Sequence, residues 1–240
     1  MKPEDNFLFL IKIGNLEKIR EVIPLITDLN PYLLFSINSG NLDIVKLLLQ
    51  YGADINYENL FLETPLLIAS KTRSLDMVKY LMENGANIDT KDLYGNTPIL
   101  NASIAGDIDV LDFFFKNGLD INSKNNEGYT LLHYASLYGY EDLVNYLIEN
   151  GIDIDAKDYQ GNTPLHIAAK NNNFEIVKIL HNNGARLDIR NNDGKTVKDI
   201  EYSTDITRYL SNAQQLYDKK VIYNYLWPIV YYKIKSMEDN

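Results

Sequence analysis

A threonine, a proline and a histidine lie within four positions of one another in the segment QGNTPLHIAAK, residues 160–170. Thr163 and His166 could act as nucleophile and general base, because a histidine can accept the proton of a nearby hydroxyl group. The same two residue types recur 33 residues earlier, as Thr130 and His133. Catalysis needs one convergent set of nucleophile, base and orienting group, and not a periodic series. The pattern therefore favours structural histidines, and we expect neither catalytic residues nor enzyme activity.

Metal chemistry is not indicated by the acidic loops. The segments KDLYGN (91–96) and KDYQGN (157–162) contain aspartates, but they lack the alternating acids and the final glutamate of a calcium loop. Turns rich in Asp, Asn and Gly explain them better. The chain has no cysteine, which excludes disulfides and thiolate metal sites. We therefore expect no metal ion and no cofactor.

Composition narrows the classes of partner. The chain of 240 residues has 33 acidic and 23 basic side chains, a formal net charge of -10. This charge repels phosphate backbones, so we expect no nucleic-acid ligand. The apolar run FLFLIKI (7–13) follows two acids and contains a lysine, unlike a signal peptide. No stretch reaches the roughly 18 uninterrupted apolar residues of a membrane span. We expect a cytoplasmic protein, or one delivered into a host cell without a Sec signal.

Three residue markers repeat with a period of 33. A threonine recurs, usually followed by proline: Thr64, Thr97, Thr130, Thr163 and Thr196. A glycine keeps the same step, at Gly52, Gly85, Gly118, Gly151 and Gly184. A second glycine series precedes the threonines by two residues, at Gly95, Gly128, Gly161 and Gly194. Three markers in one register indicate a repeated structural unit.

Each unit is interpreted as two short helices and a loop. Thr163 suits the N-cap of the first helix and Pro164 its first position, where a missing N–H costs nothing. This helix is expected to end near Asn172, since asparagine tolerates the left-handed conformation. Apolar residues spaced by three and four predict a second helix over 174–182, which Gly184 ends. The rest of the unit is a loop or hairpin.

These units resemble the ankyrin repeat, a β-turn followed by two antiparallel helices with the motif T-P-L-H-x-A. The resemblance covers about residues 28–200 and implies an all-α solenoid of stacked helix-turn-helix units with hairpin loops, plus a C-terminal helical extension. It also implies that His133 and His166 are hydrogen-bonding structural residues. We divide the chain into an N-terminal capping repeat (1–27), ankyrin repeats (28–190), a C-terminal capping repeat (191–216) and an aromatic-rich helical extension (217–240).

Some positions depart from the family pattern. Leu62 replaces the hairpin glycine and Arg73 the glycine between the helices, so we expect local distortion in 59–74. His181 stands where other units have an apolar residue and is interpreted as a packing residue. Lys198 replaces an apolar core residue of the last unit, as expected of a cap that faces water.

Stacked repeats form an extended concave surface that suits protein binding. The resemblance to ankyrin repeats implies that the exposed, variable positions lie at the hairpin tips and on the solvent-facing part of the first helix. Here these positions hold large apolar residues, whereas turn tips are normally polar, which predicts a continuous apolar strip that binds a protein. The abundance of tyrosine, 18 in all, is the alternative explanation. The candidate protein-binding residues are Tyr57, Leu60, Phe61, Leu93, Tyr94, Tyr129 and Tyr159 on loops, and Ile104, Leu137 and Tyr138 on first helices.

We interpret the chain as a monomeric, non-catalytic scaffold or adaptor that binds a protein through its concave face and hairpin tips. One alternative is a bacterial or viral effector that inhibits a host enzyme, and another is a peripheral membrane adaptor. The segment from residue 217 could be a cap on the last repeat, a second partner-binding helix or a membrane-interface helix. Its predicted apolar helical face consists of Ile222, Tyr225, Leu226 and Ile229.

Overall fold

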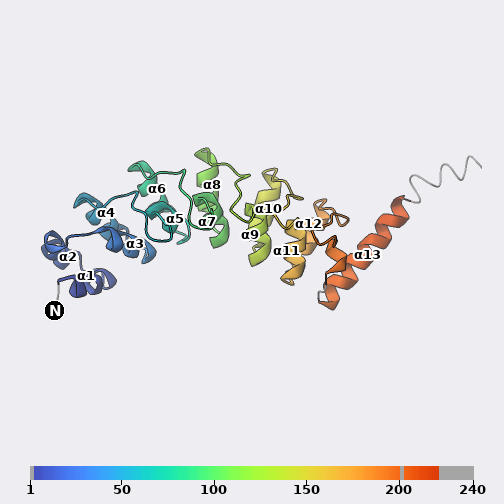
Figure 1. The fold of residues 1–240 in the computed structure, drawn as a ribbon, viewed down its shortest axis with the longest axis horizontal. Coiled ribbons are helices and arrows are strands. Elements are labelled where there is room, and N and C mark those ends of the chain that lie inside the picture. Colours follow the sequence, from blue (N-terminus) through green and yellow to red (C-terminus); the bar gives the residue numbers. More distant parts are fainter. Residues whose placement is uncertain (1–2, 201–202, 222–240) are drawn as a thin grey trace, which may run out of the picture.

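The computed structural model describes residues 3–200 and 203–221, and all its regular elements in these ranges are helices. They stack as antiparallel pairs into an elongated arc (Figure 1). The first helix of each pair lies on the concave side: α1 (Pro3–Lys12), α3 (Asn30–Asn38), α5 (Pro65–Ala69), α7 (Pro98–Ala105), α9 (Leu131–Tyr138) and α11 (Pro164–Lys170). The second lies on the convex side: α2 (Leu16–Val22), α4 (Leu42–Gln50), α6 (Leu75–Glu83), α8 (Ile108–Lys116), α10 (Glu141–Glu149) and α12 (Phe174–Asn182). The ankyrin-type all-α solenoid expected from the sequence is confirmed.

The α11–α12 pair shows how the sequence sets one repeat. Thr163 has extended backbone angles at the N-cap and Pro164 occupies the first turn of α11. Asn172 is left-handed, with φ of 57°, so the chain reverses where the sequence predicted. The second helix has the expected bounds, Phe174–Asn182. Gly184, with φ of 94°, turns the chain into the loop.

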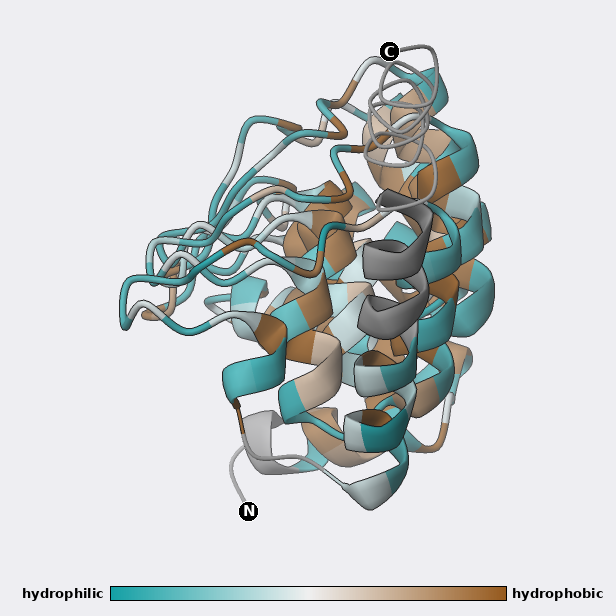
Figure 2. Ribbon diagram, turned by 90° about the vertical axis from the view of Figure 1, so that its right-hand side faces the viewer, coloured by the Kyte–Doolittle hydropathy of each residue, from teal (hydrophilic) through white to brown (hydrophobic). Residues whose placement is uncertain are grey.

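The apolar core lies between the two layers of helices, and the loops extend to one side of them (Figure 2). Each first helix buries small or branched residues against both neighbours, as Leu165 and Ala168 do in α11. Each second helix buries one face, for example Ile176, Val177 and Leu180 in α12. Because each repeat packs on its neighbours, the core runs through the whole stack.

Five loop tips are joined to one another by backbone hydrogen bonds. We number the tips along the chain as 59–63, 92–96, 125–129, 158–162 and 191–195. A backbone N–H of each tip donates to a carbonyl of the preceding one: Leu93 to Phe61 (3.1 Å), Asn126 to Tyr94 (2.9 Å), Tyr159 to Glu127 (2.9 Å) and Asn192 to Gln160 (2.9 Å). The tips therefore form one connected row.

The distortion expected around Leu62 is not found in the turn itself. Leu62 takes the left-handed conformation, with φ of 57°, that glycine has in other tips, and its N–H reaches the Asn59 carbonyl at 2.9 Å. Arg73 is also left-handed, with φ of 55°. Side chains impose both geometries: the Asn59 carboxamide holds the turn, and Nε of Arg73 donates to the Ala105 carbonyl at 2.8 Å. The distortion is limited to α5, which has five residues against eight in α7.

The two ends of the stack differ from the inner repeats. Between α2 and α3 lies a 3-10 helix, η1 (Ile23–Leu25). The last repeat has a 3-10 helix, η2 (Val197–Asp199), in place of a first α-helix, and Lys198 is exposed there. One continuous helix follows, α13 (Thr204–Val221), which buries Ile206 and Leu210.

The contact between α12 and α13 includes a histidine. Nδ1 of His181 lies 2.9 Å from the Tyr209 hydroxyl, so His181 packs between the last two helices. The predicted apolar face of Ile222, Tyr225, Leu226 and Ile229 lies outside the described residues.

Candidate protein-binding surface

The two repeated histidines brace successive repeats. Nδ1 of His133 lies 3.2 Å from the Thr130 N–H and 2.9 Å from its hydroxyl. Because the backbone N–H can only donate, Nδ1 is an acceptor, and the ring proton is on Nε2. That proton points to the Asn162 carbonyl of the next repeat, at 3.1 Å. His166 makes the corresponding contact with the Lys195 carbonyl, at 3.3 Å.

Burial favours the neutral form of both histidines. Desolvation lowers the pKa of His133 to about 4, although the hydrogen bond to the Asn162 carbonyl opposes the change. The pKa of His166 is also lowered, again mainly by burial. Both histidines are buried, and both ring nitrogens of each have protein partners. Among the described residues, no group of three or more His, Cys, Asp or Glu is arranged to hold a metal ion.

Each loop tip is built around one side-chain oxygen. In the first tip, Oδ1 of Asn59 accepts the backbone N–H groups of Phe61 (2.8 Å) and Glu63 (3.0 Å). Asp92 holds Tyr94 and Asn96 in the same way, both at 2.9 Å. Asn125, Asp158 and Asn191 repeat this arrangement in the later tips. The arrangement fixes the tip backbone and projects the two residues after the Asn or Asp.

These two projecting positions differ along the row. They are apolar in the first two tips: Leu60 is 95% exposed, Phe61 61%, Leu93 50% and Tyr94 69%. Leu62 adds a further exposed apolar side chain. Because the Leu93 N–H bonds to the Phe61 carbonyl, the two tips form one surface. We call Leu60, Phe61, Leu62, Leu93 and Tyr94 the apolar tip patch.

The expected continuous strip is interrupted at the third tip. Its projecting residues are Asn126 and Glu127, both exposed and polar. Tyr129, expected on the strip, is half-buried because its ring stacks on His133, with centroids 5.3 Å apart. In the fourth tip Tyr159 alone is exposed and aromatic. The apolar surface of the tips is therefore concentrated at the first two.

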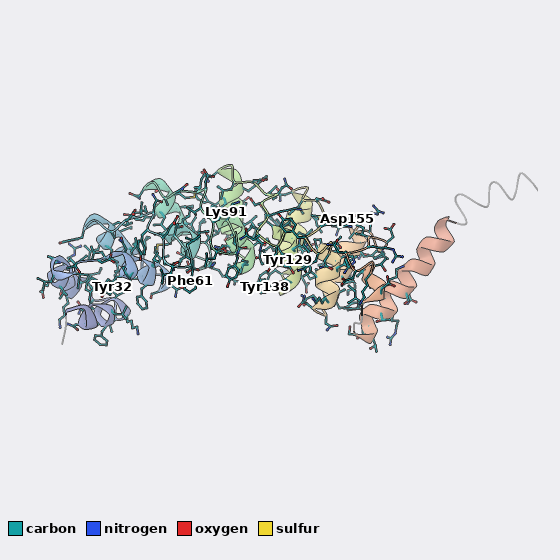
Figure 3. The ribbon with its side chains drawn as sticks, viewed as in Figure 1. Tyr32, Phe61, Lys91, Tyr129, Tyr138 and Asp155 are labelled. Carbon is teal, nitrogen blue, oxygen red and sulfur yellow. The ribbon has the colours of Figure 1, made fainter. Side chains whose placement is uncertain are left out.

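The other predicted binding residues divide by exposure. Ile104 and Leu137 are half-buried and pack against the core. Tyr57 is half-buried as well. Tyr138 is exposed at the end of α9, and Figure 3 places it, like Phe61, toward the concave side of the arc. The concave face thus offers one further aromatic ring near the row of tips.

Sequence reasoning missed the role of Tyr134. Its ring is buried in α9, and its hydroxyl donates to Oδ1 of Asn96 at 2.8 Å and accepts from Nδ2 of Asn125 at 2.9 Å. It therefore ties the second tip to the third. The signal was available in the sequence, because the positions 33 residues away hold Asn101 and Ile167, and a tyrosine is larger and more polar than the isoleucine.

Comparisons with known proteins give the family. A family model of ankyrin repeats (3 copies) matches residues 10–92 and 33–125, and a second, ankyrin repeats (many copies), matches residues 132–181. A search of curated proteins gave no match. The motifs, the helical stack and these matches agree, and the chain belongs to the ankyrin-repeat family.

Proposed function

We propose that the chain is a non-catalytic binding module whose protein partner contacts the apolar tip patch and the adjoining concave face. Ankyrin repeats generally mediate protein–protein interactions and are typically non-catalytic. The observation that carries the proposal is the exposure of Leu60, Phe61, Leu93 and Tyr94 on two hydrogen-bonded tips. Contiguous exposed apolar side chains are typical of interaction sites.

The rigidity of the tips favours binding at this place. Asn59 and Asp92 each hold two backbone N–H groups of their own tip, so little conformational entropy is lost when a partner orders the patch. Phe61 and Tyr94 supply large rings with few rotatable bonds, and aromatic residues are frequent among those that dominate interface energies. The patch is therefore preorganised for an apolar partner surface.

Strain at Leu62 supports a role beyond folding. A left-handed conformation costs an L-residue about 1–2 kcal/mol, and glycine avoids this cost. Gly95 and Gly128 hold the equivalent positions in the next two tips. Leu62 thus lowers the stability of the fold but adds a third exposed apolar side chain beside Leu60 and Phe61. Strained residues of this kind cluster at functional sites.

The alternative of membrane attachment concerns the segment 217–240, of which residues 222–240 lie outside the described part. No helix within residues 3–200 and 203–221 has the length and apolar character needed to cross a bilayer. Inhibition of a host enzyme would be one outcome of protein binding and would use the same surface. The apolar tip patch is therefore the place to test first.

Affinity capture with three immobilised chains tests the proposal. The wild type, the patch variant F61S/Y94S and the tip variant E127S, which alters the equivalent position in the third tip, are each incubated with the same cell extract. Partners should be retained by the wild type and by E127S and lost from F61S/Y94S, with melting temperatures unchanged because all three side chains are exposed. Equal retention by all three chains would show that the patch is not the binding site.

A further inference from the structure

A repeated position lies at the end of each first helix or just after it. Counting in steps of 33, its occupants are Lys71, Ile104, Leu137 and Lys170. Nζ of Lys71 lies 3.1 Å from the Glu63 carboxylate and 3.7 Å from that of Asp92. Burial raises the pKa of Glu63, but hydrogen bonds from Asn59 and Lys71 and the charge of Lys71 lower it further, so that the net change is downward. Lys71, in the N-terminal half of the stack, thus has two carboxylate partners within the chain itself.

Lys170 occupies the same position three repeats later without these acids. The residues equivalent to Glu63 and Asp92 are Asn162 and Asn191, which are neutral. They bond to each other, from Nδ2 of Asn191 to Oδ1 of Asn162 at 3.0 Å. A second lysine, Lys195, lies 33 residues after Asn162, at the equivalent position of the next repeat. In the part of the chain that the structure describes, neither Lys170 nor Lys195 has an ion-pair partner.

The two lysines line a single hollow of about 370 Å³ between the fourth and fifth tips and the end of α11. Its wall also includes Asn162, Asn191 and Ile200, and one acid, Asp193. This volume admits a side-chain carboxylate. With two exposed lysines and one acid among its lining residues, the hollow is locally cationic in a chain whose net charge is -10.

We propose that this hollow binds a carboxylate of the partner polypeptide, which takes the place that Glu63 and Asp92 occupy beside Lys71. The inference rests on the proposed function, because the partner that contacts the tips supplies the acid. Charge complementarity selects an acidic side chain, and the exposed ammonium groups can form charge-assisted hydrogen bonds with it.

Repeat spacing predicts the form of the partner segment. Neighbouring helices pack about 8–10 Å apart, so the hollow lies roughly 25 Å from the second tip along the stack. An extended chain advances about 3.3 Å per residue. The partner segment therefore carries apolar side chains for the tip patch and an Asp or Glu about seven or eight residues away.

A random 16-residue peptide library displayed on phage provides the probe, with the intact chain as bait. Selected peptides should combine an apolar pair with an acid at this spacing. Their dissociation constants are then measured for the wild type, K170Q/K195Q and the control K18Q/K91Q. The control removes the same charge from Lys18, on the N-terminal cap, and from Lys91, which Figure 3 places away from Phe61. We expect K170Q/K195Q to weaken binding about three- to tenfold, an effect reduced in high salt.

The outcomes separate the two proposals. Peptides without acids, or peptides bound equally by K170Q/K195Q and the wild type, would overturn the carboxylate site even if F61S/Y94S abolished binding. Acid-containing peptides that are sensitive to K170Q/K195Q but indifferent to F61S/Y94S would support the hollow and reject the tip patch. Unchanged melting of all variants is expected, because Lys170 and Lys195 are exposed.

Discussion

The repeats that begin at Thr64 and Thr97 contrast with those that begin at Thr130 and Thr163. We call them the first and the second pair of repeats. In the second pair His133 and His166 bridge to the next repeat. In the first pair Leu67 and Leu100 hold the histidine position. The hydroxyl of Thr97 is consequently buried without a hydrogen-bond partner among the described residues. The histidine brace between repeats is thus found in the second pair and not in the first.

The exposed loop surface is more apolar in the first pair of repeats than in the second. The loops of the first pair project Leu60, Phe61, Leu93 and Tyr94, whereas polar residues dominate in the second pair. The first pair also contains the left-handed Leu62 and Arg73 in place of glycines. Departures from local rules that coincide with exposed apolar surface are typical of functional sites. We therefore propose that the first pair serves binding, whereas the second pair contains the histidine braces of the fold.

Lowering the pH should produce the largest difference in stability between the two pairs of repeats. The pKa of His133 is lowered from 6.5 to about 4 by burial, so the unfolded chain binds the proton first as pH falls. The stabilisation by neutral His133 is therefore complete above about pH 6.5 and is lost as the pH falls toward 4. Between pH 7 and 5 the loss from this group is about 2 kcal/mol. Urea unfolding of the wild type and of His133→Leu at both pH values measures it.

The His133→Leu variant carries the residue type that position 100 has naturally, and its stability should fall less with acid than that of the wild type. Hydrogen exchange, corrected for intrinsic rates, should show faster opening at pH 5 in residues 125–200 than in residues 30–100. An equal loss of stability on acidification in the wild type and the variant would contradict the role given to His133.

Removing one hydroxyl from each pair gives the next largest effect. Thr130→Val deletes the hydroxyl that lies 2.9 Å from Nδ1 of His133 and accepts the His133 N–H, while the Thr130 N–H remains a partner of Nδ1. The loss of these side-chain hydrogen bonds should cost about 1 kcal/mol. Thr97→Val removes a buried hydroxyl that has no partner among the described residues, and should change stability by less than about 0.5 kcal/mol. Thermal and urea unfolding of the two variants measure the difference. Similar costs at both positions would show that the histidine braces add little.

Relief of strain gives the smallest effect. Leu62→Gly should stabilise the chain by about 1 kcal/mol or less, because the left-handed strain of Leu62 is relieved while glycine makes the unfolded chain more flexible. The control Leu60→Gly alters a tip residue that is not left-handed and is more exposed than Leu62, 95% against 41%. It should destabilise slightly in urea unfolding. A destabilised Leu62→Gly variant would mean that the leucine contributes packing that outweighs its strain.

The sequence predicts the fold well because the 33-residue period sets both helices of each repeat. The bounds of α12 and the left-handed Asn172 follow from apolar spacing and turn chemistry alone. The binding surface is less predictable, because exposure depends on contacts between repeats. Tyr129 has a tip position in the sequence, yet its ring stacks on His133. Likewise, the missing counter-ions of Lys170 become visible only when residues 63 and 92 are seen beside Lys71.

Calorimetric titration of the captured partner into three chains tests the central claim most directly. The chains are the wild type, F61S/Y94S from the first pair and the control E127S, which alters the equivalent position in the next tip, away from the patch and the lysine-lined hollow. Loss of two aromatic anchors should weaken binding by about 2 kcal/mol or more, roughly 30-fold, whereas E127S should bind within about threefold of the wild type. Equal weakening by both variants, or a loss confined to E127S, would contradict the assignment of binding to the first pair.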